Sequence, residues 1–349
     1  MMEQSHRRYN PLTGEWILVS PQRTMRPWQG KVENVVTKKK TNYVDTCYLC
    51  PNNERANGAK NPNYPSTFVF DNDFSALKEN VEGFFINESD LLKAKSERGI
   101  CRVVCFSPKH NLTLAELELS DIVEIIKTWQ REYSILGSKE FINYVQIFEN
   151  KGEIMGCSNP HPHGQIWAQE TIPNEPAKEQ FNQENYLKDK GTTLLCDYIQ
   201  LEKEKKERIV FENESFVLLV PFWAIWPFET LIISKKIINN ILQLNEKEVE
   251  LFAEILKVTT IKYDNIFNTS FPYSAGIHQA PTDGLKHDEW HFHMHFYPPL
   301  LRSAIIKKFM VGYEMLAEPQ RDITPETSAK ILRQADSVHY LLKTAKAGL

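Results

Sequence analysis

The chain repeats one order of apolar and polar positions. A β-rich run at 99–108, GICRVVCFSP, precedes apolar residues at helical spacing over 112–136 and the strand-like NYVQIFENKG at 143–152. The same order recurs in SFVLLVPFWAIWPFETLIISKK at 215–236, in a helix-like stretch at 244–267, and in strand-like runs at 271–281 and 289–299. Each half ends in a segment with alternating histidines. The pattern therefore predicts a duplicated α+β unit.

Three further segments give local predictions. Ser120 stands where its side chain can cap the helix that follows it. The first fifty residues are punctuated by proline and glycine, which is typical of loops over a larger body. Residues 186–214 have the composition of a helical connector, and their run of lysine and glutamate predicts a solvated face.

Composition narrows the class of protein. A chain of 349 residues with 42% apolar residues can bury a large core. A net charge of −4 argues against a nucleic-acid partner, because clustered Lys and Arg supply most of that affinity, but a small anionic substrate remains open. The N-terminus lacks an apolar signal region, and the longest apolar run is short and holds Pro221 and Pro227. We therefore expect a cytoplasmic protein without a membrane span.

Six cysteines in so long a chain do not make a disulfide framework. Cys47 and Cys50 in CYLC have the spacing with which two thiolates grip one tetrahedral zinc ion. A closed site needs two more ligands, for which His110 and one histidine of the HPH motif are candidates and Cys157 a competitor. An accidental pair of cysteines is the alternative. Cys101 and Cys105 lie among β-formers, where buried inert thiols are expected.

The run HFHMH places His291, His293 and His295 on one face of a strand, because side chains alternate. Three imidazoles on one face suit a metal, with iron or zinc favoured over calcium. A solvated polar edge is the alternative, since the intervening residues Trp290, Phe292, Met294 and Phe296 have the character of a core.

The motif HPHGQ places His161 and His163 where they can point the same way without sharing a role. A neutral imidazole can attack phosphorus and form a covalent phosphoramidate, which divides a transfer into two displacements. Gln165 can donate to an oxyanion but cannot act as a base, which favours group transfer over hydrolysis. Spacing alone leaves a nucleophile and a second metal ligand equally open.

A family resemblance extends from about residue 6 to about residue 325. GCSNPHPHGQIWA, RRYNPLTGEWILVSP, FENKG, PFWAIWPFETL and HFYPPLLRSAIIKKFMVGYEMLAEPQRD resemble the galactose-1-phosphate uridylyltransferases, a branch of the histidine-triad superfamily. Hydrolases of that superfamily carry a third histidine where this chain has Gln165. The resemblance implies an α+β fold of two duplicated histidine-triad-like units, 1–190 and 191–349, with a largely antiparallel sheet in a half-barrel and flanking helices.

The resemblance also implies a reaction and a site. UMP would pass from UDP-glucose to His163 and then to galactose 1-phosphate, in a ping-pong double displacement of galactose metabolism. Zinc would be held by Cys47, Cys50, His110 and His161, and a second metal, iron or zinc, by Glu179, His278, His293 and His295. His291 departs from the polar residue expected there and is left out of that set. Substrate-binding residues would be Arg23, Arg26, Asn72, Asp73, Asn150, Gly156, Cys157, Ser158, Gln165, Lys308, Phe309, Tyr313, Glu314 and Gln320.

In the family, the arginines and the hexose-end residues reach into the partner's site, which implies a homodimer with shared active sites. Two other functions stay open at this point. One is a different nucleotidyltransferase or phosphorylase of the same superfamily, and the other is a zinc-stabilised binding module without turnover.

Overall fold

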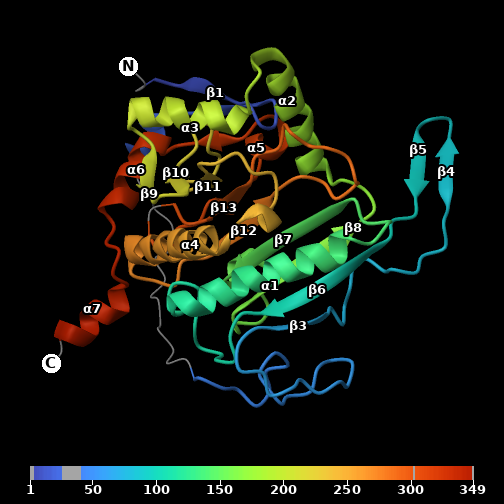
Figure 1. The fold of residues 1–349 in the computed structure, drawn as a ribbon. Coiled ribbons are helices and arrows are strands. Elements are labelled where there is room, and N and C mark those ends of the chain that lie inside the picture. Colours follow the sequence, from blue (N-terminus) through green and yellow to red (C-terminus); the bar gives the residue numbers. More distant parts are fainter. Residues whose placement is uncertain (1–3, 26–40, 302, 348–349) are drawn as a thin grey trace.

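The computed structural model describes residues 4–25, 41–301 and 303–347. A nine-stranded sheet runs through the molecule (Figure 1), and every neighbouring pair of its strands is antiparallel. In spatial order the strands are β3 (Phe68–Asp71), β6 (Gly99–Cys105), β8 (His163–Gln169), β7 (Tyr144–Lys151), β12 (Tyr273–His278), β13 (His293–Tyr297), β11 (Thr230–Ser234), β10 (Phe216–Leu219) and β9 (Ile209–Glu212).

The strand order confirms the predicted duplication. Outward from the centre, β7, β8, β6 and β3 mirror β12, β13, β11 and β10. The two halves join where β7 pairs with β12, with Asn150 opposite Ser274. Helix α1 (Leu119–Gly137) follows β6, helix α4 (Glu246–Phe267) follows β11, and the two lie over the same face of the sheet (Figure 1). Because one sheet is shared, the division at residue 190 stays a prediction.

The core explains why the strands of the two halves differ in sequence. Apolar residues of α1 and α4 pack against one face of the sheet. In the second half the other face is also covered, by α3 (Leu194–Lys205) and a small sheet of β1 (His6–Asn10), β2 (Glu15–Val19) and β14 (Gln320–Arg321). Strands β10 and β11, buried on both faces, are therefore apolar throughout, whereas β8 alternates between buried and half-buried positions.

Three local predictions were wrong. The first fifty residues are not all loop, since β1 and β2 form a hairpin with Tyr9 opposite Trp16. Ser120 does not cap α1, because the N-cap is Glu118 and Ser120 already lies in the first turn. The charged run of the connector is not wholly solvated, because Glu202 is buried and accepts a hydrogen bond from Arg208 Nε at 2.8 Å.

The remaining elements surround the sheet. They are η1 (Pro21–Met25), β4 (Phe85–Glu88), β5 (Leu92–Lys95), η2 (Glu153–Met155), α2 (Asn174–Lys190), η3 (Ile241–Gln243), α5 (Tyr313–Leu316), α6 (Pro325–Gln334) and α7 (Tyr340–Ala347). The loop before β13 is tied by His287, whose two ring nitrogens lie 2.8 Å from Glu289 Oε1 and 2.9 Å from Asp283 Oδ1. Within the described ranges, no helix is long and apolar enough to cross a membrane.

Candidate active site and metal centres

Strand β8 positions the residues of the HPHGQ motif. It begins at His163, and the alternation of its burial puts His163, Gln165 and Trp167 on one half-buried face. The opposite face is tightly packed at Gly164, where an added Cβ would lie 2.7 Å from the Phe106 ring and 2.9 Å from the Phe148 carbonyl oxygen. His161 lies before the strand, so the two histidines of the motif have different surroundings.

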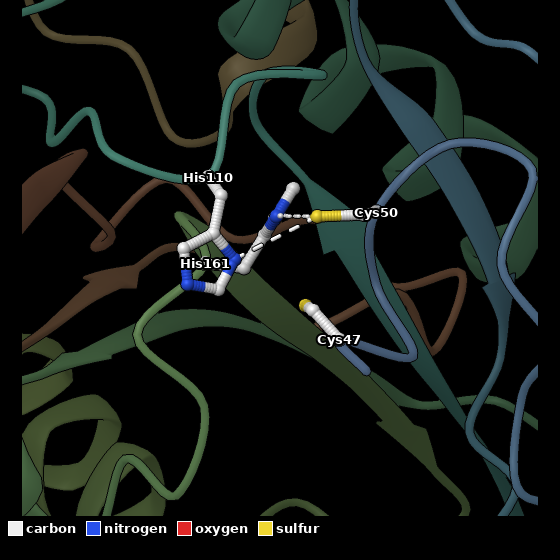
Figure 2. A group of neighbouring side chains, drawn as sticks. All are labelled: Cys47, Cys50, His110 and His161. Atoms are coloured by element: carbon white, nitrogen blue, oxygen red, sulfur yellow. Dashed lines mark hydrogen bonds between the residues drawn. The ribbon is translucent and has the colours of Figure 1, made fainter. Parts of the chain in front are cut away.

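Four buried side chains from distant parts of the sequence meet beside this strand: Cys47, Cys50, His110 and His161 (Figure 2). Their ligand atoms all lie within 4.8 Å of one another. Cys50 Sγ is 3.7 Å from His110 Nδ1 and 3.5 Å from His161 Nδ1. A tetrahedral zinc site with bonds of about 2.0 to 2.3 Å has ligand-to-ligand edges of about 3.6 Å. The donor set and its spacing therefore fit zinc. Cys157, the competitor, lies outside this cluster and its Sγ donates to Asn159 O.

The surroundings of His161 fix which ring nitrogen faces the cluster. Its Nε2 lies 2.8 Å from the Ser107 carbonyl oxygen, which only accepts, so Nε2 carries the proton. Nδ1 then presents its lone pair toward Cys50. Burial lowers the pKa of His161 to about 4, which keeps the ring neutral. A carbonyl that fixes the tautomer of a histidine ligand is a common companion of metal sites.

His163 is held in the tautomer that a nucleophile needs. Its Nδ1 lies 2.7 Å from the carbonyl oxygen of His161 and must donate to it, which leaves the lone pair on Nε2. Burial lowers the pKa of His163 below its ordinary value, so the ring is neutral at pH 7. The same carbonyl can stabilise positive charge that develops on the ring during attack.

The amide of Gln165 is oriented by its neighbour on the strand. Trp167 Nε1 donates to Gln165 Oε1 at 3.0 Å. The oxygen is therefore occupied, and the amide nitrogen remains as the donor for an anion in front of His163.

Two adjoining cavities open beside His163, with volumes of about 320 and 670 Å³. Every nucleotide-pocket residue expected from the family resemblance lines the smaller one, namely Asn72, Asp73, Asn150, Gly156, Cys157, Ser158 and Gln165. Sequence reasoning missed several apolar walls of this cavity, Tyr48, Leu49, Phe70, Phe74 and Val103. Tyr48 and Leu49 lie within the CYLC motif and Phe70 and Phe74 within FDNDF, whereas Val103 lies in neither motif.

The expected hexose-end residues gather elsewhere. Lys308, Phe309, Glu314 and Gln320 line a cavity of about 130 Å³ that shares no lining residue with the two beside His163. Arg23 belongs to this group, since its Nε is 3.1 Å from Asp322 Oδ1. Tyr313 lies nearby in sequence, on α5, but outside that lining, and its hydroxyl donates to Glu318. Arg26 lies outside the described residues.

A second buried cluster joins Glu179 of α2 to His278, His293 and His295 of β12 and β13. Their nitrogens lie 3.0, 3.2 and 3.3 Å from the Glu179 carboxylate oxygens. Burial alone would raise the pKa of Glu179, but His278 and His293 lower it well below its ordinary value. Both nitrogens of buried His295 lack a hydrogen-bond partner of good geometry among the described residues. Unpaired lone pairs that converge on a carboxylate fit a metal site.

His291 does not share the face of His293 and His295, because β13 starts only at His293. The Nε2 of His291 lies 2.6 Å from Ser234 O, and its Nδ1 3.1 Å from Thr193 Oγ1. The intervening residues are buried, as expected for a core: Trp290, Phe292, Met294 and Phe296.

Comparisons with known proteins agree across almost the whole chain. Residues 1–173 match the model of the galactose-1-phosphate uridyl transferase N-terminal domain, and residues 178–344 match that of its C-terminal domain. The chain is 52% identical to a galactose-1-phosphate uridylyltransferase of Haemophilus influenzae, covering 98% of this chain and 97% of that relative. It is 46% identical to one of Rattus norvegicus, covering 97% and 90%.

Solved structures show the same fold. A structure described as a uridylyltransferase superposes with a TM-score of 0.75 at 27% identity, covering 94% of this chain and 97% of that one. An ADP-glucose phosphorylase from Arabidopsis thaliana superposes with a TM-score of 0.76 at 23% identity, covering 95% and 99%. At that identity the second likeness concerns the fold alone.

Proposed function

The chain belongs to the galactose-1-phosphate uridylyltransferase family, and we propose the route by which it exchanges UMP between UDP-glucose and galactose 1-phosphate. The transfer proceeds through a covalent uridylyl group on His163. The observation that carries this proposal is the hydrogen bond of 2.7 Å from His163 Nδ1 to the His161 carbonyl oxygen, beside a cavity of about 320 Å³.

In the first displacement, His163 Nε2 attacks the α-phosphorus of UDP-glucose. A phosphorus–nitrogen bond forms, the bond to the bridging oxygen breaks, and glucose 1-phosphate leaves. The ring gains positive charge, which the His161 carbonyl oxygen stabilises through the proton on Nδ1. In the second displacement, a phosphate oxygen of galactose 1-phosphate attacks the same phosphorus, the phosphorus–nitrogen bond breaks, and UDP-galactose forms.

Gln165 assists both displacements from the same face of β8. Its amide nitrogen donates to a phosphoryl oxygen, because its own oxygen is occupied by Trp167 Nε1 at 3.0 Å. An amide cannot take a proton from water, so the uridylyl-histidine waits for a sugar phosphate. Asn150 has a matching orientation, since its Oδ1 accepts from Ser274 Oγ at 2.7 Å and its nitrogen remains as a donor.

We assign zinc to the cluster of Cys47, Cys50, His110 and His161, and iron or zinc to that of Glu179, His278, His293 and His295. The two thiolates favour zinc at the first site. By binding the His161 side chain, the ion would also fix the position of the His161 carbonyl oxygen, which accepts a hydrogen bond from His163. Thiolate ligands persist in a reducing compartment, which supports a cytoplasmic location.

We further propose a homodimer with shared active sites. The separation of the hexose-end cavity from the cavities beside His163 supports this proposal, because one chain does not bring both groups around one substrate. Arg23, with Arg26, Lys308, Phe309, Tyr313, Glu314 and Gln320, would then act in the partner's site.

The covalent route is tested with UDP-glucose alone. The native enzyme is expected to release one equivalent of glucose 1-phosphate and to gain the mass of UMP. His163→Ala is expected to bind UDP-glucose, form no adduct and lose several orders of magnitude in turnover. A labelled UMP adduct on the alanine variant would overturn the assignment. If the native chain were instead a phosphorylase for a different nucleotide or a binding module without turnover, it would form no UMP adduct with UDP-glucose.

The shared site is tested by mixing two inactive variants, His163→Ala and Lys308→Ala. In a hybrid dimer with shared sites, one site is intact, so the equilibrated mixture should recover up to about a quarter of native activity. If the two residues act in the same chain, mixing restores nothing.

A further inference from the structure

One arginine lies directly behind the wall of the smaller cavity beside His163. The Arg55 guanidinium carbon is 4.3 Å from the centroid of the Phe70 ring, and its Nη1 is 3.6 Å from Asp73 Oδ1. Phe70 and Asp73 line this cavity of about 320 Å³, whereas Arg55 does not. Arg55 can therefore act on a bound nucleotide only through the residues of the wall.

The segment that carries Arg55 is tied to the loop of the first candidate metal cluster. Arg55 N donates to Ala59 O at 2.8 Å, which closes a tight turn. Just before this turn, the side chain of Asn53 donates to Cys47 O at 2.8 Å. The loop that bears the thiols thus also delivers the guanidinium to the back of the nucleotide cavity.

The pairing of Arg55 with Asp73 answers the cost of burying a carboxylate. The Asp73 side chain is 7% exposed and that of Arg55 is 14% exposed. A carboxylate so placed is costly unless a positive charge lies beside it, and Arg55 supplies that charge. At 3.6 Å the contact is longer than a hydrogen bond, and Asp73 Oδ1 accepts no hydrogen bond from the described residues. This oxygen therefore keeps its lone pairs for a donor of the ligand.

The chemistry of a uridine nucleotide limits what Asp73 can bind. A carboxylate only accepts hydrogen bonds, and it repels the phosphates, which are anionic. The flat uracil suits apolar walls such as Tyr48 and Phe70, which leaves the two ribose hydroxyls as donors. Asn72 Oδ1 accepts from Phe74 N at 2.9 Å, so the Asn72 amide nitrogen remains as a donor. A donor and an acceptor on adjacent residues match a pair of hydroxyls.

We propose that Arg55 is a positioning residue that makes the enzyme selective for ribose. The guanidinium, stacked on Phe70, holds the Asp73 carboxylate toward the ribose hydroxyls and balances its charge against the nearby phosphates. Arginine suits this place because its planar fork can stack on an aromatic face and pair with a carboxylate at the same time. The preference for a ribonucleotide thus depends on a residue that does not touch the ligand.

The test compares UDP-glucose with an analogue whose ribose lacks both hydroxyls. The value of kcat/KM is measured for both substrates on each preparation, so their ratio is independent of how much of the protein is folded. A hydrogen bond to a charged group changes such a ratio by roughly 10- to 150-fold, so the native enzyme should prefer UDP-glucose at least tenfold. Asp73→Ala should lose most of this preference.

Arg55→Met should also lose most of the preference, and Arg55→Lys, which keeps the charge but not the planar fork, should lose part of it. The double variant of Arg55→Met and Asp73→Ala should use UDP-glucose about as well as Asp73→Ala alone, because Arg55 acts through Asp73. An Arg55→Met enzyme that keeps the native preference would overturn the proposal, since general damage to the cavity slows both substrates alike. Losses that multiply in the double variant would overturn it too.

Arg98→Met is the matched control. Arg98 makes the same two kinds of contact as Arg55, because its Nη2 is 3.1 Å from Glu170 Oε1 and its guanidinium carbon is 4.7 Å from the centroid of the Phe141 ring. It lines neither cavity beside His163. The control should therefore keep the native preference for UDP-glucose.

This inference rests on UDP-glucose as the substrate, yet the two proposals fail differently. If the native enzyme forms no UMP adduct with UDP-glucose, the proposed function fails. If the adduct forms but the native enzyme uses the analogue equally well, Asp73 does not recognise the ribose and only the role of Arg55 is overturned.

Discussion

The orientation of Gln165 offers a graded test of how the uridylyl group is stabilised. Replacing Gln165 with alanine removes the amide nitrogen that, in the proposed route, donates to the phosphoryl oxygen. Replacing Trp167 with phenylalanine keeps the donor but removes the hydrogen bond of 3.0 Å that holds the amide oxygen. The two variants thus separate the donor from its orientation.

The expected magnitudes differ because the bonds differ in kind. A hydrogen bond to a charged oxygen contributes about 1.5 to 3 kcal/mol, so Gln165→Ala should slow transfer by roughly 10- to 150-fold. The Trp167 bond is neutral and worth about 1 kcal/mol, so Trp167→Phe should slow transfer by about fivefold. Gln169→Ala is the control, because Gln169 shares this face but lies about 20 Å along the strand from His163.

The assay is single-turnover. The uridylyl enzyme is formed with UDP-glucose, free nucleotide is removed, and loss of the adduct is timed with and without galactose 1-phosphate. In the two variants the rate with sugar phosphate should fall in the stated order, while decay in water stays slow because no base has been introduced. Equal rates in Gln165→Ala and the native enzyme would refute the role of the amide. A larger loss in Trp167→Phe than in Gln165→Ala would refute the orienting role.

Three further predictions address metal, pH and packing. Cys50→Ser should lower bound zinc, melting temperature and activity together, whereas full zinc content measured by elemental analysis would contradict the ligand assignment. Burial alone would lower the pKa of His287, but its two carboxylate partners raise it. Its stabilising effect is therefore complete below pH 6.5 and lost as pH rises through the raised pKa. Urea unfolding should accordingly show His287→Gln to cost more stability at pH 6 than at pH 9. Gly164→Ala should destabilise by about 1 to 3 kcal/mol in the same assay, with Gly83→Ala near neutral because its added Cβ would lie 4.0 Å from Ser96 Oγ, an ordinary contact distance.

The sequence could predict those features that depend mainly on residues near one another in the chain. Helical and strand periodicity is set by the backbone, so α1, α4 and the strands of both halves could be placed from apolar spacing. Ser120 was misjudged because a cap depends on the residue at which the helix starts. Glu202 was misjudged because its partner Arg208 is only six residues away, but whether the fold buries the pair cannot be read from the sequence around it.

The candidate sites show the same limit. CYLC identified two thiols, but the spacing left His110, His161 and Cys157 in competition. Only the folded chain decides among them, because the His161 ring is turned toward Cys50 by the Ser107 carbonyl, whereas Cys157 turns to Asn159.

The duplication explains how one geometry can serve two different roles. His293 Nδ1 lies 2.7 Å from the His291 carbonyl oxygen, as His163 Nδ1 does from that of His161. In the second half, strand register puts His278 opposite His293. In the first half, Phe148 is opposite Gln165. Two residues further along the antiparallel pair, Asn150 therefore lies at the matching place beside His163. The second half thus has imidazoles at His278 and His295 where the first half has amides at Asn150 and Gln165.

That exchange decides what each Nε2 can do. Amides donate to an anion but bind metals weakly, so His163 Nε2 faces a cavity suited to a phosphoryl group. Imidazoles offer lone pairs to a metal. In the second half, the Glu179 carboxylate of α2 lies 3.2 Å from His293 Nε2, so the carboxylate occupies the place that an incoming phosphate would need. In the proposed assignments, the same tautomer therefore makes His163 a nucleophile where its neighbours donate hydrogen bonds, and His293 a metal ligand where its neighbours donate electron pairs.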